Sequence, residues 1–304
     1  MWFFKGIRSP LLVGSVALLS LGGGRVSAQE PDSLPRPPWE GEPELGSVGF
    51  NPAGEGHHPL LRPFIDLGYA GRDFGVDAWR VASSPARLTR KPALQLGAFV
   101  AVGGVLAALD ESITDQLRSA TRDGLHGEIR SLGDFFEPAA LQNNTNAALA
   151  GVAVLAYLTK QRWLGEPAKQ ILYSQWISGL TRHATGAAVG RLRPYQSDGP
   201  FEFEPGRGKS FPSGHSAAAM EIATVLSHHL KSRIASVALY TAAATVVFQR
   251  VDDDAHWASD AWFGAGLGIV IAKIVIETEE ARMLSVRPAA GSDGRIGLSV
   301  SFSF

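Results

Sequence analysis

The sequence has no cysteine, almost no net charge and no apolar run long enough to be an obvious membrane span. The absence of cysteine among 304 residues excludes disulfides, a thiol nucleophile and a thiolate metal site. The formal net charge of −1 gives no overall basic field for nucleic acid, so no nucleic-acid partner is expected. With 45% hydrophobic residues the chain can still form a sizeable core.

The first 63 residues have the composition of an export signal followed by a linker. Lys5 and Arg8 precede an apolar run over residues 11–21, and small residues follow it, which is typical of a secretory signal peptide over 1–28. The alternative is an uncleaved membrane anchor. Residues 29–63 are rich in proline and glycine and predict a linker. Either reading predicts an exported protein of the periplasm or cell envelope.

The middle of the chain predicts an all-α bundle of about six core helices. Segments rich in alanine and leucine alternate with polar turns. They cover residues 93–109, 147–158, 169–189, 216–230, 234–248 and 261–276. The mixed segment 67–84 predicts short outer helices. The polar segment 110–145 predicts a connection with a short helix that shapes the mouth of a site.

Length and hydropathy favour a soluble or peripheral bundle, with membrane association as the alternative. Runs such as 93–109 and 234–248 are shorter than the about 20 residues needed to cross a bilayer. The mean hydropathy of +0.04 points the same way. Gly264-x-x-x-Gly268 suits close helix packing in either solvent. We expect one helical domain over residues 64–280.

The C-terminal residues 281–304 differ from the rest. Apolar and polar residues alternate over 295–304, and a glycine-containing turn signal precedes them. This pattern predicts a short β-hairpin.

Three clusters of polar residues lie at helix ends. They are Gly190-Arg-Leu-Arg-Pro194, Phe211-Pro-Ser-Gly-His215, and Arg250 with His256 and Asp260. The first follows one predicted helix and the second precedes the next. The third lies between the last two helices. In an up-and-down bundle all three would meet at one end.

Together the clusters have the chemistry of a phosphate site. Arg193 and Arg250 supply charged forks for phosphate oxygens, and the turn at Ser213 and Gly214 adds neutral donors at a helix N-terminus. Of two histidines, one can attack phosphorus and the other can protonate the leaving oxygen. Asp260 lies one helical turn after His256, so its carboxylate is expected to hold a ring N–H of that histidine.

Arg193-Pro194, Pro212-Ser-Gly-His215 and Arg250-x5-His256-x3-Asp260 resemble the three motifs of the type 2 phosphatidic acid phosphatase (PAP2) superfamily, which includes class A acid phosphatases and vanadium haloperoxidases. The similar region, about residues 169–277, is a third of the chain. The resemblance implies that His256 is the nucleophile, Asp260 its partner and His215 the general acid. It also implies that four residues bind the phosphoryl oxygens: Arg193, Ser213, Gly214 and Arg250.

Two positions depart from the family pattern. Gly186 stands where the family has a lysine, which removes one cation, and Gln249 replaces the serine before Arg250. The substitute cations that we consider are Arg182, Arg191 and Lys209. Arg182 lies one turn before Gly186 on the same face of its helix.

The expected function is an exported phosphatase that cleaves phosphate monoesters, lipid phosphates or small esters, through a phosphohistidine. One alternative is a vanadium-dependent haloperoxidase, which would need vanadate as cofactor. Another is a non-catalytic envelope scaffold with a degenerate site. The phosphatase needs no cofactor or metal, and the acidic run 252–254 is interpreted as a solvated loop.

Overall fold

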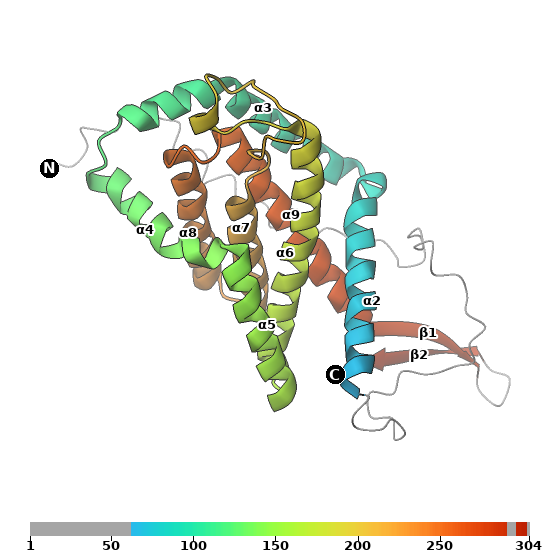
Figure 1. Cartoon of the computed structure of the whole chain (residues 1–304). Coiled ribbons are helices and arrows are strands. Elements are labelled where there is room, and N and C mark those ends of the chain that lie inside the picture. The colour runs from blue at the N-terminus through green and yellow to red at the C-terminus, as the bar shows by residue number, and fades with distance from the viewer. Residues whose placement is uncertain (1–61, 291–295, 303–304) are drawn as a thin grey trace, which may run out of the picture. The chain divides into compact units, whose positions relative to one another are not determined.

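The computed structural model describes residues 62–290 and 296–302 (Figure 1). The expected signal peptide and nearly all of the expected linker lie outside these residues, as does the turn of the expected hairpin.

Eight α-helices, rather than about six, occur in the described residues. They are α2 (Arg62–Ser83), α3 (Arg90–Ser119), α4 (Gly124–Ala140), α5 (Gln142–Thr159), α6 (Arg162–Val189), α7 (Gly214–Leu230), α8 (Arg233–Asp252) and α9 (Ala258–Met283). The two extra helices are α2 and α4. The sequence predicted only short helices in these two segments, because both are rich in charged residues and lack a long apolar run. The all-α interpretation of this region is confirmed, and the helix count is corrected.

The chain divides into two compact units. Within the described residues, one unit comprises 89–273, with α3 to α8 and most of α9, and the other comprises 62–88 and 274–302. The division falls inside the expected 64–280 domain. In the second unit, strands β1 (Leu284–Ala290) and β2 (Ile296–Phe302) pair antiparallel, with Leu284 opposite Phe302.

One arginine joins α2 to the end of α9 within the second unit. Arg282 contacts Asp73 at 2.9 Å and Asp77 at 2.5 Å, both on α2, and Glu279 at 2.5 Å on its own helix. Asp77 is fully buried, and a buried carboxylate needs such a partner.

Helix α7 packs against α6, α8 and α4 in the first unit, where Figure 1 shows α7, α8 and α9 side by side. Small residues make this possible. A Cβ atom at Gly264 would lie 2.3 Å from the carbonyl oxygen of Ser213, and one at Gly268 would lie 2.3 Å from that of Ala217. The glycine pair therefore lets α9 pack directly on α7, as the sequence predicts. This contact brings the start of α9 next to the start of α7.

Among the described residues, three helices are long and apolar enough to cross a membrane: α3, α8 and α9. The apolar runs of the sequence underestimated these helices, since α3 has 30 residues and α8 has 20. Large apolar side chains are exposed on α3, including Leu94 and Val105. Exposed apolar faces of this kind are suited to lipid. These findings favour the membrane-associated alternative over the soluble or peripheral bundle.

Candidate active site

The three polar clusters meet at one end of the first unit. The end of α6 leads into Arg191 and Arg193, α7 starts beside His215, and the connection from α8 to α9 carries His256. The charges of Arg193 and Arg250 both lower the pKa of His215 and of His256, which requires these four side chains to lie near one another. The structure thus brings together residues that are far apart in sequence.

The start of α7 is held by Ser213, whose buried hydroxyl caps the helix. It accepts hydrogen bonds from the Ser216 N–H at 3.4 Å and the Ser216 hydroxyl at 2.9 Å, while the Ser213 N–H donates to the carbonyl of Asp260 at 3.0 Å. In both bonds the Ser213 oxygen accepts, so its own O–H remains a possible donor and the expected role of this hydroxyl in phosphate binding stays a prediction. The N–H groups of Gly214 and His215 follow it, and first-turn N–H groups have no intrahelical partner.

His256 is buried, with 3% of its surface exposed, and one ring nitrogen is held by the backbone. Its Nδ1 donates to the carbonyl oxygen of Ser210 at 2.7 Å. A carbonyl only accepts, so the proton sits on Nδ1 and the Nε2 lone pair is available. Burial, aided by the charge of Arg193, lowers the pKa of His256 well below its ordinary value. The imidazole is therefore neutral at neutral pH, as a nucleophile must be.

Asp260 does not hold the ring of His256, and that expectation is wrong. Its Oδ2 accepts from the Ser210 hydroxyl at 2.5 Å and from the Trp257 N–H at 3.2 Å, and its Oδ1 pairs with Arg191 at 2.8 Å. Asp260 lies in the first turn of α9, where its carboxylate receives the N–H of Trp257 rather than a ring nitrogen. It acts on His256 indirectly, by fixing Ser210.

Arg191 is structural, which corrects its inclusion among the substitute phosphate cations. It is 5% exposed, and its guanidinium donates to Asp110 at 2.8 Å, Asp260 at 2.8 Å, Ser259 at 2.7 Å and the Pro200 carbonyl at 2.8 Å. The two carboxylates come from α3 and α9. Arg191 therefore links three parts of the unit behind the site.

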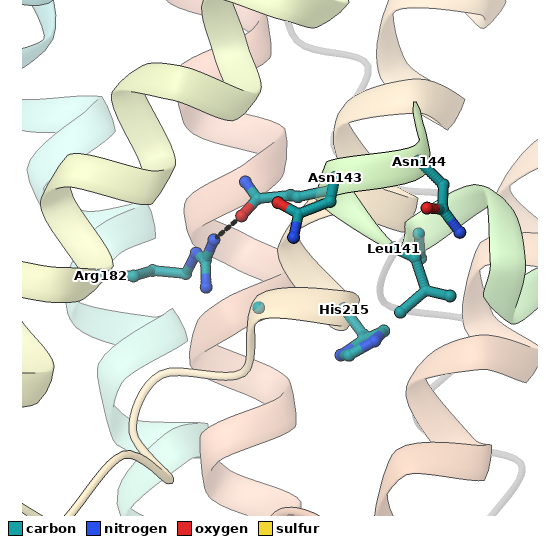
Figure 2. A pocket seen from close by; sticks show the side chains of 8 residues that line it. Leu141, Asn143, Asn144, Arg182 and His215 are labelled. Atoms are coloured by element: carbon teal, nitrogen blue, oxygen red, sulfur yellow. Dashed lines mark hydrogen bonds between the residues drawn. The ribbon is translucent and has the colours of Figure 1, made fainter. Parts of the chain in front are cut away.

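A pocket of about 310 Å³ opens beside His215 (Figure 2). It is lined by Ala140, Leu141, Gln142, Asn143, Asn144, Arg182, Gly214 and His215. Burial, followed by the charges of Arg250, Arg182 and Arg193, lowers the pKa of His215 to about 4. In this environment His215 is neutral at neutral pH until an anion binds nearby and raises its pKa.

Arg182 reaches the same pocket from α6. Its Nη2 donates to Oε1 of Gln142 at 2.6 Å, the dashed bond in Figure 2. A Cβ atom on Gly214 would lie only 2.3 Å from Nη1 of Arg182, so the guanidinium lies against the backbone at the start of α7. A side chain at position 186 would begin 3.3 Å from the carbonyl oxygen of Phe211. Arg182 thus places a cation at the turn that Gly186 leaves without one.

The remaining cations differ in their surroundings. Arg193 stacks over the ring of Tyr195, with its guanidinium carbon 5.9 Å from the ring centroid. Arg250 is largely buried and pairs with Glu137 of α4. Lys209 is exposed, and within the described part of the chain no contact places it in the site. Gln249 is buried, its amide N–H groups donate to Asp134 at 3.0 Å and Asp253 at 2.6 Å, and its amide oxygen accepts from Nη1 of Arg250 at 3.4 Å.

Sequence reasoning missed two parts of the site, Glu137 and the amide side chains at the start of α5. Both belong to the segment expected to be a polar connection, in which only a role at the mouth of a site was foreseen. The acidic run 252–254 is also not a solvated loop. Asp252 is buried and pairs with His126 at 2.8 Å and with Arg130, and Asp254 pairs with Arg118 at 3.1 Å.

No group of three or more histidine or acidic residues suited to a metal ion occurs in the part of the chain that the structure describes.

Comparison with known proteins identifies the region that contains these residues. Residues 167–284 match the family model of the PAP2 superfamily. Over 89 residues the chain is 39% identical to a lipid A 1-phosphatase of Porphyromonas gingivalis, a match that covers 29% of this chain and 18% of that protein. The chain thus matches less than a fifth of the relative's length.

A solved structure with a similar arrangement is the first transmembrane PAP2-type phosphatidylglycerolphosphate phosphatase from Bacillus subtilis. It is 19% identical, with a TM-score of 0.46, over 60% of this chain and 95% of that one. The family match covers all three motifs and confirms the resemblance seen in the sequence. Residues 167–284 of this chain are thus similar to the PAP2 superfamily.

Proposed function

We propose that this protein is a membrane-associated phosphatase that hydrolyses phosphate monoesters, with lipid phosphates as the preferred class. The observation that carries the proposal is the state of His256. This buried, neutral imidazole has its Nδ1 proton fixed on the Ser210 carbonyl and its other nitrogen available for attack. The family match and the names of the two relatives, both phosphatases, support the same activity.

The proposed reaction has two displacement steps. Nε2 of His256 attacks phosphorus, the P–O bond to the leaving group breaks, and His215 donates its proton to the leaving oxygen. Water then attacks the phosphohistidine. His215 takes a proton from that water, the P–N bond breaks, and inorganic phosphate leaves with His256 again neutral.

Three arginines and one helix end are proposed to hold the phosphoryl oxygens. Arg182, Arg193 and Arg250 supply charge, and the first N–H groups of α7 add neutral donors. Most of the rate enhancement then comes from positioning and from charge stabilisation, as phosphoryl transfer requires. Bound phosphate also raises the pKa of His215 and favours the protonated acid.

A lipid substrate is supported by the helices that are suited to a membrane, and export to the periplasm or envelope remains a proposal from the N-terminal sequence. The relatives do not favour the haloperoxidase alternative. Arg182 weighs against a degenerate site, because it supplies a cation beside Gly214.

The protein, purified in detergent, is expected to release inorganic phosphate from a lipid phosphate monoester such as phosphatidate. The rate should exceed that on a soluble ester such as p-nitrophenyl phosphate, because an apolar substrate can reach the site from the membrane. A phosphate-release assay over both classes measures this. No release from any ester would exclude the phosphatase.

Arg182→Gln is expected to lower kcat/KM by about tenfold to a hundredfold, the range for the loss of a charged hydrogen bond worth about 1.5–3 kcal/mol. The neutral amide keeps part of the volume and removes the charge. Arg207→Gln is a matched control, because the Arg207 side chain is 83% exposed and pairs with nearby Glu204. Equal rates for wild type and Arg182→Gln would show that Arg182 is not the substitute cation.

A further inference from the structure

The carboxylate of Glu137, on α4, lies among the cationic groups that the proposed phosphatase uses to hold phosphate. Its Oε1 accepts a hydrogen bond from Nη1 of Arg250 and lies 3.8 Å from Nε2 of His215. One oxygen atom therefore contacts both a proposed phosphate-binding arginine and the proposed general acid.

A phosphoryl oxygen would make the same contacts. Guanidinium groups pair with carboxylate and with phosphate in the same geometry, and the leaving-group oxygen must lie beside the acid. Nε2 of His215 and Nε of Arg250 are both buried without a hydrogen-bond partner among the described residues. These donors are available to an anion larger than a carboxylate.

The carboxylate can leave this position. The side chains of Glu137 and His215 are each 27% exposed, and that of Arg250 is 13% exposed. His215 also lines the pocket, so a ligand has access to the pair. An ion pair that is open to solvent on one side exchanges partners at low cost.

We infer that Glu137 occupies the place of a phosphoryl oxygen before substrate binds, and that phosphate displaces it from Arg250. The inference rests on the proposed phosphatase function and deepens it. Three arginines and a helix end would hold the product phosphate tightly. A carboxylate that returns to Arg250 offsets this attraction and assists phosphate release.

Competition with phosphate and a purely structural role of Glu137 predict opposite changes in phosphate affinity when its charge is removed. If Glu137 only orients Arg250, removal of its charge leaves the arginine mobile and weakens phosphate binding. If it competes with phosphate, removal of its charge strengthens phosphate binding. The affinity for inorganic phosphate therefore distinguishes the two roles.

The test is calorimetric titration of inorganic phosphate into the full-length protein in detergent, for wild type and Glu137→Gln. The Kd for phosphate is expected to fall by about tenfold or more, the size of effect that one charge at ion-pair distance has on a coupled equilibrium. The KM for a phosphate ester should fall with it. Glu128→Gln removes the same charge from an exposed position of α4 and should leave the Kd unchanged.

A Kd that rises or stays the same in Glu137→Gln would overturn the inference. If this variant does not fold, Glu137→Asp decides, because it keeps the charge but withdraws the carboxylate from Arg250 by one methylene and should also bind phosphate more tightly. The titration needs no turnover. Absence of activity in the wild type would thus contradict the proposed function, while the phosphate affinities would still decide the role of Glu137.

Discussion

Replacement of His256 by asparagine is expected to lower kcat by about 10⁴-fold or more, the scale of losses seen when the nucleophile of a covalent mechanism is removed. The asparagine amide can still donate to the Ser210 carbonyl, which now receives the Nδ1 proton. The substitution therefore removes Nε2 while retaining the contact that positions the side chain. Phosphate release under saturating substrate is the measurement.

The control for this variant is His183→Asn. His183 is an exposed histidine of α6 whose Nδ1 donates to the Gly179 carbonyl of the same helix. It should keep wild-type activity. If His256→Asn retained more than a few per cent of the wild-type rate while folding normally, His256 could not be the nucleophile.

Arg191→Met should destabilise the protein by about 3–5 kcal/mol, the cost of breaking a buried ion pair by removing one partner. Arg191 is the only group that pairs with Asp110 and Asp260 together in the described part of the chain. Methionine fills much of the volume but leaves both buried carboxylates without a cation. Thermal unfolding in detergent should show a large fall in Tm.

Arg193→Met is the matched control, two residues away. Arg193 is partly exposed and stacks on Tyr195, so its loss should change the free energy of unfolding by about 1 kcal/mol or less while lowering kcat/KM. The two measurements therefore distinguish the arginines: Arg191→Met mainly lowers stability, and Arg193→Met mainly lowers activity. A stable but inactive Arg191→Met would contradict the structural assignment.

The sequence was sufficient to group the three motifs because each lies at a helix end. Polar residues at the end of one helix and the start of the next must lie close together when short turns join antiparallel helices. The close packing at Gly264 and Gly268 was also predictable, since two glycines at four-residue spacing leave one helix face without Cβ atoms. Both features could be predicted because they depend on residues that lie close together in the sequence.

The hydrogen-bond partners of the site could not be read from spacing. Asp260 lies one turn after His256, yet its carboxylate bonds to Ser210 and Arg191, because the chain between the residues turns before α9 begins. No sequence motif predicted that Glu137 belongs to the site, because α4 reaches the site only through tertiary packing. Its contact with Arg250 spans 113 positions of sequence.

The number of helices and the length of the apolar ones were underestimated for a related reason. An amphipathic helix such as α4 has no continuous apolar run, and the charged ends of α3 hid its full length of 30 residues. Length, not only apolar content, decides whether a helix can cross a bilayer.

The central claim is that His256 forms a covalent bond to phosphorus. The most direct test is to quench the reaction during turnover of a phosphate ester and to locate the phosphoryl group by mass spectrometry. The expected result is a phosphohistidine, stable to base and labile to acid, on the peptide that contains His256, and its absence in His256→Asn. A phosphoryl group on another residue, or turnover without any phosphorylated peptide, would contradict the mechanism.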